Sequence, residues 1–211
     1  HLKVTMSGGM ALSHATAKHW EALTGCGVSE GYGLTETSPV VAANPGNRRE
    51  LGTIGLPLPA TRVKGVDATG QHQPRGEPGE LCVAGPQVMQ GYWNRPEETA
   101  EVLDEQGWFH TGDIAVVRED GYLKIVDRKK DMILVSGFNV YPNELEDVLY
   151  EHEDVLECAA VGVPDDESGE AISMFVVSRS GKLTAEEVRD FMRRSLTGYK
   201  IPRHVQFRRE L

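Results

Sequence analysis

The sequence predicts a mixed fold, in which an α/β segment is followed by a β-rich segment and then by a small α+β domain. Residues 1–50 combine a strand pattern with a helix pattern around glycines, and residues 51–126 contain short β-rich runs between glycines and prolines. Residues 132–211 alternate strand and helix patterns, which is typical of a compact α+β unit. The charged stretch at 127–131 is predicted to be a hinge between 1–126 and 132–211.

The first segment reads as strand, glycine turn and helix. Leu2–Met6 alternates like a strand and runs into Gly8 and Gly9, Ser13 is a predicted N-cap, and Gly25 is a predicted helix end. Its partner strands must lie elsewhere, so we expect this strand and helix to have uncovered apolar faces, with disorder or oligomerisation as consequences. One face of the predicted helix is formed by residues that recur at helical spacing, namely Leu12, Thr16, His19, Trp20 and Leu23.

The second segment is predicted to form a small barrel or a distorted sheet. Its β-rich runs are short, regularly spaced and separated by turn residues, and a short helix is expected at Asn94–Val102. The predicted strands are Arg62–Val66, Gly79–Ala84, Ile114–Arg118 and Tyr122–Val126.

The third segment contains the best-marked helix, Thr184–Leu196. Thr184 and Glu187 have the spacing of a capping box, which satisfies two backbone donors at a helix start. Its predicted apolar face consists of Val188, Phe191, Met192 and Ser195. The other expected elements are strands at Met132–Val135, Val155–Val163 and Ala171–Val177, and a helix at Pro142–Glu151.

The composition argues against several classes of partner and site. The formal net charge is −10, which argues against nucleic acid because phosphate binding needs a surplus of Lys and Arg. No apolar run approaches the roughly 18 residues of a membrane span. The three cysteines, Cys26, Cys82 and Cys158, are far apart and lack C-x-x-C spacing, so they are expected to be reduced thiols of a cytosolic protein rather than zinc ligands.

The hexapeptide Gly31–Glu36, GYGLTE, is the first candidate site. Glycines beside Tyr32 let the backbone approach a ligand, and the ring offers a stacking face. The Thr35 hydroxyl can hold a phosphate oxygen, and Glu36 offers a hard oxygen ligand suited to Mg²⁺. On these residues alone, a glycine-rich turn with an exposed acid remains an alternative.

A second candidate is Trp108–Asp113, which presents an acid after a predicted glycine turn. One carboxylate can accept hydrogen bonds from both hydroxyls of a ribose, although a turn with a capping aspartate is the simpler reading of Asp113. His110 is expected to be structural. The run at Asp127–Asp131 would otherwise be read as solvated charge.

Taken together, Gly31–Glu36 and Gly107–Asp131 resemble the AMP-forming acyl-CoA synthetases of the adenylate-forming superfamily. The stretch Ile133–Glu146, ILVSGFNVYPNELE, looks most like a bacterial long-chain fatty-acid–CoA ligase. The resemblance covers essentially all 211 residues but only a middle-to-late part of such an enzyme. It implies that 1–126 is the end of the large adenylate-forming domain and that 132–211 is the small C-terminal domain, truncated at its end. The phosphate loop and the C-terminal catalytic lysine of the family would lie outside this chain, which is therefore expected to be inactive alone.

The resemblance also implies roles for single residues. Tyr32 would pack on adenine, Thr35 would contact the α-phosphate, Glu36 would bind Mg²⁺ and Asp113 would bind the ribose. Four glycines would line the nucleotide site: Gly8, Gly9, Gly31 and Gly33. Gly8 and Gly9 would also border the acyl chain.

Four further residues take implied roles around the hinge. Arg128 would reach the ribose or a phosphate. Lys130 aligns with the position about which the small domain swings. Lys130 is predicted both as a nucleotide-binding residue and, together with Thr35 and Glu36, as a catalytic residue. Gly137, with Phe138 beside it, would border the tunnel for coenzyme A.

The implied activity is the ATP-dependent conversion of a long-chain fatty acid to its acyl-CoA, with ATP, Mg²⁺ and coenzyme A as cosubstrates and cofactor. Alternatives are a short-chain, medium-chain or aryl-acid ligase, an amino-acid-activating domain, a non-catalytic nucleotide-binding module or a β-rich adaptor. The expected location is the cytoplasm, with peripheral contact with the inner membrane, and a homodimer is left open.

Overall fold

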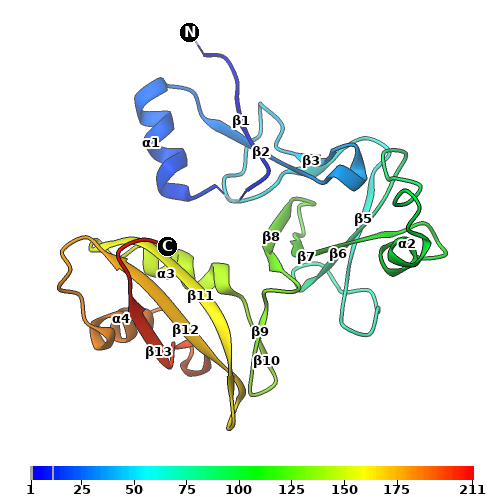
Figure 1. The fold of residues 1–211 in the computed structure, drawn as a ribbon. Coiled ribbons are helices and arrows are strands. Elements are labelled where there is room, and N and C mark those ends of the chain that lie inside the picture. Colours follow the sequence, from blue (N-terminus) through cyan, green and yellow to red (C-terminus); the bar gives the residue numbers. More distant parts are fainter. Residues whose placement is uncertain (1, 11) are drawn as a thin grey trace. The chain divides into compact units, whose positions relative to one another are not determined.

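The computed structural model describes residues 2–10 and 12–211, and the chain divides into two compact units (Figure 1). The first spans His1–Val126 and the second spans Asp127–Leu211. Each unit is described by itself.

The first sheet of unit 1 has the strand order β1-β2-β3-β4. β1 (Thr5–Ser7) pairs in parallel with β2 (Val28–Gly33), and β3 (Val40–Ala43) and β4 (Leu56–Pro57) continue the sheet in antiparallel fashion. A parallel pair needs a crossover, which α1 (His14–Thr24) provides.

The predicted caps of α1 are confirmed. The Ser13 hydroxyl accepts a hydrogen bond from the Thr16 amide, and Gly25 adopts φ 66°, the left-handed conformation that ends a helix. Ala17 is buried, whereas Trp20 and Leu23 are exposed.

Exposed apolar residues gather on α1, on β1 and on the residues just before it, in line with the expected uncovered apolar faces. Leu2, Val4 and Met6 are 55%, 69% and 62% exposed, and Leu23 is 72% exposed. The strand is also shorter than predicted, since only Thr5–Ser7 pair with a neighbour.

The second sheet of unit 1 is an open, distorted sheet rather than a closed barrel. Its order is β5-β6-β7-β8, with antiparallel pairing of β5 (Arg62–Val66), β6 (Pro78–Ala84) and β7 (Phe109–Val117). β8 spans Leu123–Arg128, and the expected short helix is α2 (Pro96–Val102).

The predicted turn before Asp113 is wrong, because these residues belong to β7. Glu80 pairs with Ile114 while Cys82 pairs with His110, so between these pairs one residue of β6 opposes three of β7. The extra length is a bulge around Gly112, whose φ is 73°. Bulges redirect side chains and often lie beside active sites.

The two sheets of unit 1 share one core. A bridge joins Gly55, just before β4, to Leu123 at the start of β8. Buried residues from both sheets then pack together, namely Val41, Ala42, Leu81, Val83, Ala115 and Leu123, with Tyr32 partly buried against them.

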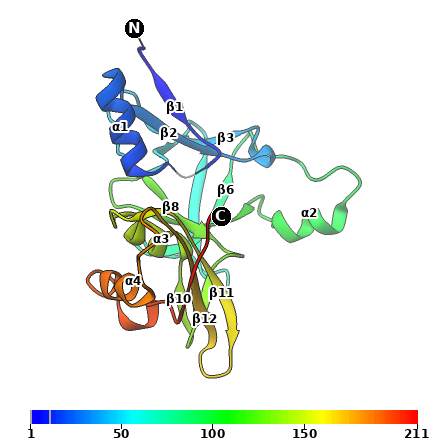
Figure 2. The same ribbon diagram turned by 60° about the vertical axis from the view of Figure 1, so that its left-hand side comes forward.

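Unit 2 is a mixed sheet covered by two helices. β12 (Gly169–Ser178) is its centre: it pairs antiparallel with β11 (Val155–Asp165) and β9 (Ile133–Val135) and in parallel with β13 (His204–Phe207), and β10 (Phe138–Val140) adds to β9. Figure 2 shows α3 (Pro142–Tyr150) and α4 (Ala185–Met192) on the same side of this sheet. Leu145, Leu149, Val188 and Met192 fill the core between helices and sheet.

The capping box of α4 is confirmed, but the helix is shorter than predicted. Thr184 accepts from the Glu187 amide while the Glu187 carboxylate accepts from the Thr184 amide. Beyond Met192 the chain tightens into i→i−3 bonds, which ends the α-helix and leaves Ser195 exposed rather than on the core face.

Candidate active site

The strand end that carries GYGLTE is shaped by a close backbone contact. Gly33 ends β2, and a Cβ added there would lie 1.9 Å from the Pro39 carbonyl oxygen. The Leu34 amide donates to that same oxygen at 3.0 Å. Gly33 is therefore required by the chain's own turn, whereas the sequence had suggested approach to a ligand as its reason.

The turn after Gly33 presents Thr35 and Glu36 and is held by Thr37, a residue that the sequence analysis missed. Thr37 is fully buried, and its hydroxyl accepts from the Leu34 amide at 3.0 Å. The same hydroxyl lies 2.6 Å from the Pro39 carbonyl oxygen, to which it donates. Its place three residues after Leu34, the spacing of a side chain that closes a turn, was the available signal.

The structure brings together Tyr32 and Asp113, the two residues predicted for adenine and ribose. The Tyr32 hydroxyl donates to Asp113 Oδ2 at 2.5 Å, although 81 residues separate them. The β7 bulge makes this possible, and Thr111 fixes it: its hydroxyl donates to the Leu81 carbonyl at 2.8 Å and accepts from the Asp113 amide at 3.1 Å.

Burial raises the pKa of Tyr32, and the hydrogen bond to Asp113 and the charge of its carboxylate raise it further. The phenol therefore keeps its proton at neutral pH and acts as a donor. Asp113 Oδ2 accepts this bond.

Glu36 contacts a loop of unit 1 that the sequence did not indicate as a partner. The Tyr92 hydroxyl donates to Glu36 Oε1 at 2.8 Å, and the Met89 amide donates to the Glu36 carbonyl at 2.8 Å. The loop 85–95 thus passes beside the turn that carries Glu36 (Figure 2). Burial and the neighbouring Glu36 carboxylate raise the pKa of Tyr92.

The glycine pair Gly8-Gly9 follows β1, at the expected strand end. A Cβ on Gly8 would lie 3.1 Å from the Gly31 carbonyl oxygen, and Gly9 has φ 85°. The structure therefore places the pair beside the start of GYGLTE, and both residues are exposed.

In unit 2, the predicted Arg128 and Lys130 are exposed, whereas Asp127 is buried. The Asp127 carboxylate accepts from the Arg128 amide at 2.7 Å and from the Asn143 amide, in the first turn of α3, at 2.9 Å. A carboxylate at a helix N-terminus accepts hydrogen bonds from backbone amides that have no acceptor within the helix, and its negative charge interacts favourably with the helix dipole. Burial raises the pKa of Asp127.

Gly137 lies in the two-residue turn between β9 and β10. Ser136 has φ 50° and Gly137 has φ 84°, as the favoured hairpin turn with two left-handed residues requires. A Cβ on Gly137 would meet no atom within 4 Å, so conformation rather than space selects glycine here. Phe138 stacks on Tyr199 with ring centroids 4.8 Å apart. The coenzyme A role of this turn stays a prediction.

His110 lies among polar groups of the second sheet. Its Nδ1 is 3.4 Å from Cys82 Sγ and 3.4 Å from Glu80 Oε2. Across residues 2–10 and 12–211, no group of three or more His, Cys, Asp or Glu side chains is arranged to hold a metal ion. Glu36 still suits Mg²⁺, which typically takes one or two protein carboxylates and completes its shell with water and substrate phosphates.

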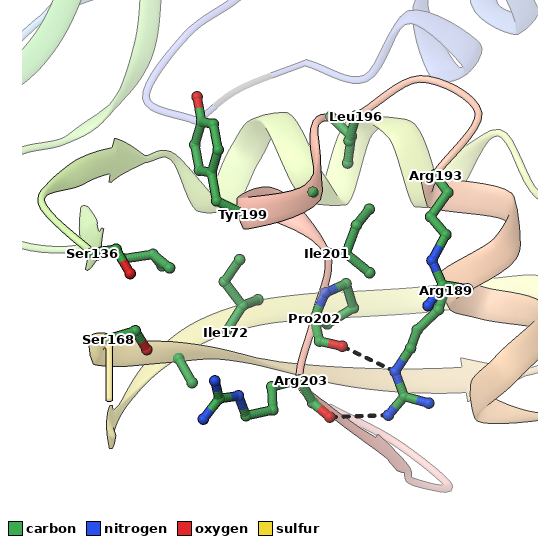
Figure 3. A pocket seen from close by; sticks show the side chains of 13 residues that line it. Ser136, Ser168, Ile172, Arg189, Arg193, Leu196, Tyr199, Ile201, Pro202 and Arg203 are labelled. Atoms are coloured by element: carbon green, nitrogen blue, oxygen red, sulfur yellow. Dashed lines mark hydrogen bonds between the residues drawn. The ribbon is translucent and has the colours of Figure 1, made fainter. Parts of the chain in front are cut away.

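A cavity of about 750 Å³ lies in unit 2, and the residues that line it include none of those predicted to bind the nucleotide (Figure 3). Its three arginines are paired with acids: Arg189 with Glu186, Arg193 with Glu186 and Asp190, and Arg203 with Asp165 and Glu167. Arg189 also donates to the carbonyls of Pro202 and Arg203. The cavity therefore carries no uncompensated positive charge for an anion, and Arg189 instead holds the chain that enters β13.

Two family models match the chain, one for the AMP-binding enzyme over residues 1–93 and one for the AMP-binding enzyme C-terminal domain over residues 144–211. A long-chain-fatty-acid–CoA ligase of Escherichia coli O6:H1 is 56% identical over 211 residues, which are 100% of this chain and 37% of that protein. A feruloyl-CoA synthase of Amycolatopsis is 45% identical over 181 residues, covering 84% of this chain and 37% of that protein.

Among solved structures, ATP-bound MatB from Rhodopseudomonas palustris matches with a TM-score of 0.93 and 36% identity, over 99% of this chain and 42% of that one. In the described residues, no helix is both long and apolar enough to cross a membrane. The chain spans about 37% of the length of the curated ligases that it matches. It belongs to the AMP-binding enzymes, as a segment homologous to bacterial long-chain-fatty-acid–CoA ligases.

Proposed function

We propose that this chain forms part of an enzyme that activates long-chain fatty acids with ATP and transfers them to coenzyme A. In the first half-reaction, a carboxylate oxygen of the fatty acid attacks the α-phosphorus of ATP and pyrophosphate leaves, which gives an acyl-adenylate. In the second, the coenzyme A thiol attacks the acyl carbonyl and AMP leaves. The identity of 56% over the whole chain to ligases of that name supports the acid class.

The single observation that carries the proposal is the convergence of Tyr32 and Asp113. These residues come from different sheets of unit 1 and meet at 2.5 Å, next to the turn that presents Thr35 and Glu36. We assign the Tyr32 ring to the adenine and the Asp113 carboxylate to the ribose hydroxyls. The exposed Thr35 hydroxyl would donate to an α-phosphate oxygen.

Glu36 would hold Mg²⁺, which when bound neutralises charge on the phosphates during adenylation. Because the reaction needs little covalent chemistry from the protein, placing ATP and the acid correctly would supply much of the rate. In unit 2, we assign Arg128 to the ribose or a phosphate, Lys130 to the hinge, and Gly137 with Phe138 to the coenzyme A tunnel.

A second candidate, an aryl-acid–CoA ligase, is favoured by the feruloyl-CoA synthase, which is 45% identical over 84% of this chain. The test is acid-dependent release of pyrophosphate by a protein of the relatives' length that contains this chain, called here the full-length enzyme. Preference for laurate and longer acids over ferulate and benzoate supports the first assignment. The reverse preference supports the second and keeps the nucleotide site.

A further inference from the structure

Tyr92 lies in the loop between β6 and α2 and contacts the residue assigned to Mg²⁺. Its hydroxyl donates to Glu36 Oε1 at 2.8 Å across 56 residues of sequence. The loop also contacts the Glu36 backbone, because the Met89 amide donates to the Glu36 carbonyl at 2.8 Å. One bond to the carboxylate and one bond to the backbone carbonyl therefore tie this loop to Glu36, the residue assigned to Mg²⁺.

Tyr92 is itself fixed from the other side. Its backbone amide donates to Thr99 Oγ1 in α2 at 2.9 Å, and its carbonyl accepts from the Arg95 amide at 3.2 Å. Gly91 has φ 151°, and a Cβ there would lie 2.8 Å from the Thr99 side chain. The tyrosine is thus anchored to α2 rather than free to follow Glu36.

An anchored donor can orient a carboxylate. A carboxylate has about four lone-pair positions on its two oxygens, and the Tyr92 bond at Oε1 leaves Oε2 and one position of Oε1 for a cation. Holding the side chain in one rotamer reduces the entropy that metal binding must remove. Groups that orient a metal ligand typically change metal affinity by about 10- to 100-fold when they are removed.

We propose that Tyr92 is a positioning residue, which holds the Glu36 carboxylate in the orientation that binds Mg²⁺ together with ATP. This inference rests on the proposed function, since it takes Glu36 as the Mg²⁺ ligand. Tyr92 itself touches neither the metal nor the reacting atoms.

The test measures ATP binding to the full-length enzyme by calorimetry at a series of Mg²⁺ concentrations, without fatty acid so that no turnover occurs. For Tyr92→Phe we expect the Mg²⁺ concentration at half-maximal ATP binding to rise by about 10-fold. Affinity for AMP, measured without Mg²⁺, should stay within about two-fold of the wild type, because a general loosening of the nucleotide site would lower both. Tyr92 is 37% exposed, so phenylalanine fits the same space.

Two comparisons make the result specific. Tyr150→Phe removes another half-exposed tyrosine hydroxyl, one bonded to the Cys158 backbone in unit 2, and should leave the Mg²⁺ requirement unchanged. In the Glu36→Gln background, adding Tyr92→Phe should cost nothing further, because the two residues act as one unit. Thr99→Val removes the acceptor of the Tyr92 amide but keeps the Tyr92 hydroxyl, and it should shift the Mg²⁺ requirement in the same direction. This second variant keeps the test valid if Tyr92→Phe fails to fold.

An unchanged Mg²⁺ requirement in Tyr92→Phe, or an equal additional loss in the Glu36→Gln background, overturns the inference. If wild-type enzyme forms acyl-adenylate and binds ATP with Mg²⁺, that failure concerns Tyr92 alone. If the wild type does neither, the proposed function fails and the inference fails with it.

Discussion

Replacing Gly33 by alanine tests whether the turn that presents Thr35 and Glu36 depends on a close backbone contact. The new Cβ would lie 1.9 Å from the Pro39 oxygen and 2.9 Å from Val40 Cα, both backbone atoms. Real Cβ atoms essentially never approach closer than 3.0 Å, so the chain must open by about 1.1 Å, the difference between 3.0 and 1.9 Å.

The energetic cost of that opening follows from two terms. Overpacking of this kind costs about 1–3 kcal/mol. Separating Gly33 from Pro39 also weakens the Leu34 amide bond to the Pro39 oxygen, which costs about 1 kcal/mol. We expect a total loss of about 2–4 kcal/mol in the unfolding free energy, measured as a lower urea midpoint with an unchanged slope.

The substitution should also lower the activity of enzyme that stays folded. A displacement of about 1 Å in positioned groups can cost about 100-fold in rate, and Thr35 and Glu36 follow Gly33 directly. We expect kcat/KM for fatty-acid-dependent ATP–pyrophosphate exchange to fall by that factor in the full-length enzyme.

The matched control is Gly46→Ala. A Cβ on Gly46 meets no atom within 4 Å and no left-handed φ is required there, so alanine should be tolerated. If Gly33→Ala lowers neither stability nor kcat/KM more than Gly46→Ala does, the close contact is not the constraint we infer.

Three further outcomes are expected. Thr111→Val removes the hydroxyl bonds that fix the β7 bulge, so Asp113 should be misplaced and AMP binding should weaken by about 3- to 10-fold. Thr111→Ser keeps the hydroxyl and should retain AMP binding. Calorimetry with AMP checks both variants. Burial raises the pKa of Cys158 to about 12, so this thiol should resist iodoacetamide at neutral pH until the protein is unfolded, and rapid alkylation of the native protein would contradict its burial. Hydrogen bonds from Ser168 lower the pKa of Asp165 in the folded state, so Asp165 should stabilise unit 2 above its unfolded pKa of about 3.9 and lose that effect as the pH falls through the lower folded pKa. Urea unfolding should therefore separate wild type from Asp165→Ala at neutral pH, with the gap narrowing in acid, and a gap independent of pH would argue against this role.

Features that depend on near neighbours in sequence were predicted well. Ser13 and Gly25 bound α1, and Thr184 with Glu187 starts α4, because a cap is made by residues within one helical turn. The end of α4 was misplaced, since apolar spacing continues past the point where the chain tightens.

Features that depend on pairing between distant strands were not predictable in the same way. The residue types of Tyr32 and Asp113 indicated a nucleotide site, but their contact needs a bulge that only the β6–β7 register reveals. The same limit hid Tyr92, whose neighbour Glu36 lies 56 residues away. The family resemblance supplied roles for single residues, and the structure supplied the connections between them.

The measurement that tests the central claim most directly is acyl-CoA synthesis by the full-length enzyme with acids from butyrate to stearate, together with Glu36→Ala. We predict a maximum at laurate and longer acids, and a loss on the order of 100-fold in the variant, since a metal contact to phosphate is worth several kcal/mol. A maximum at short or aromatic acids would contradict the long-chain assignment. Full activity of Glu36→Ala would contradict the role of this turn, and no synthesis with any acid would contradict the proposed enzyme itself.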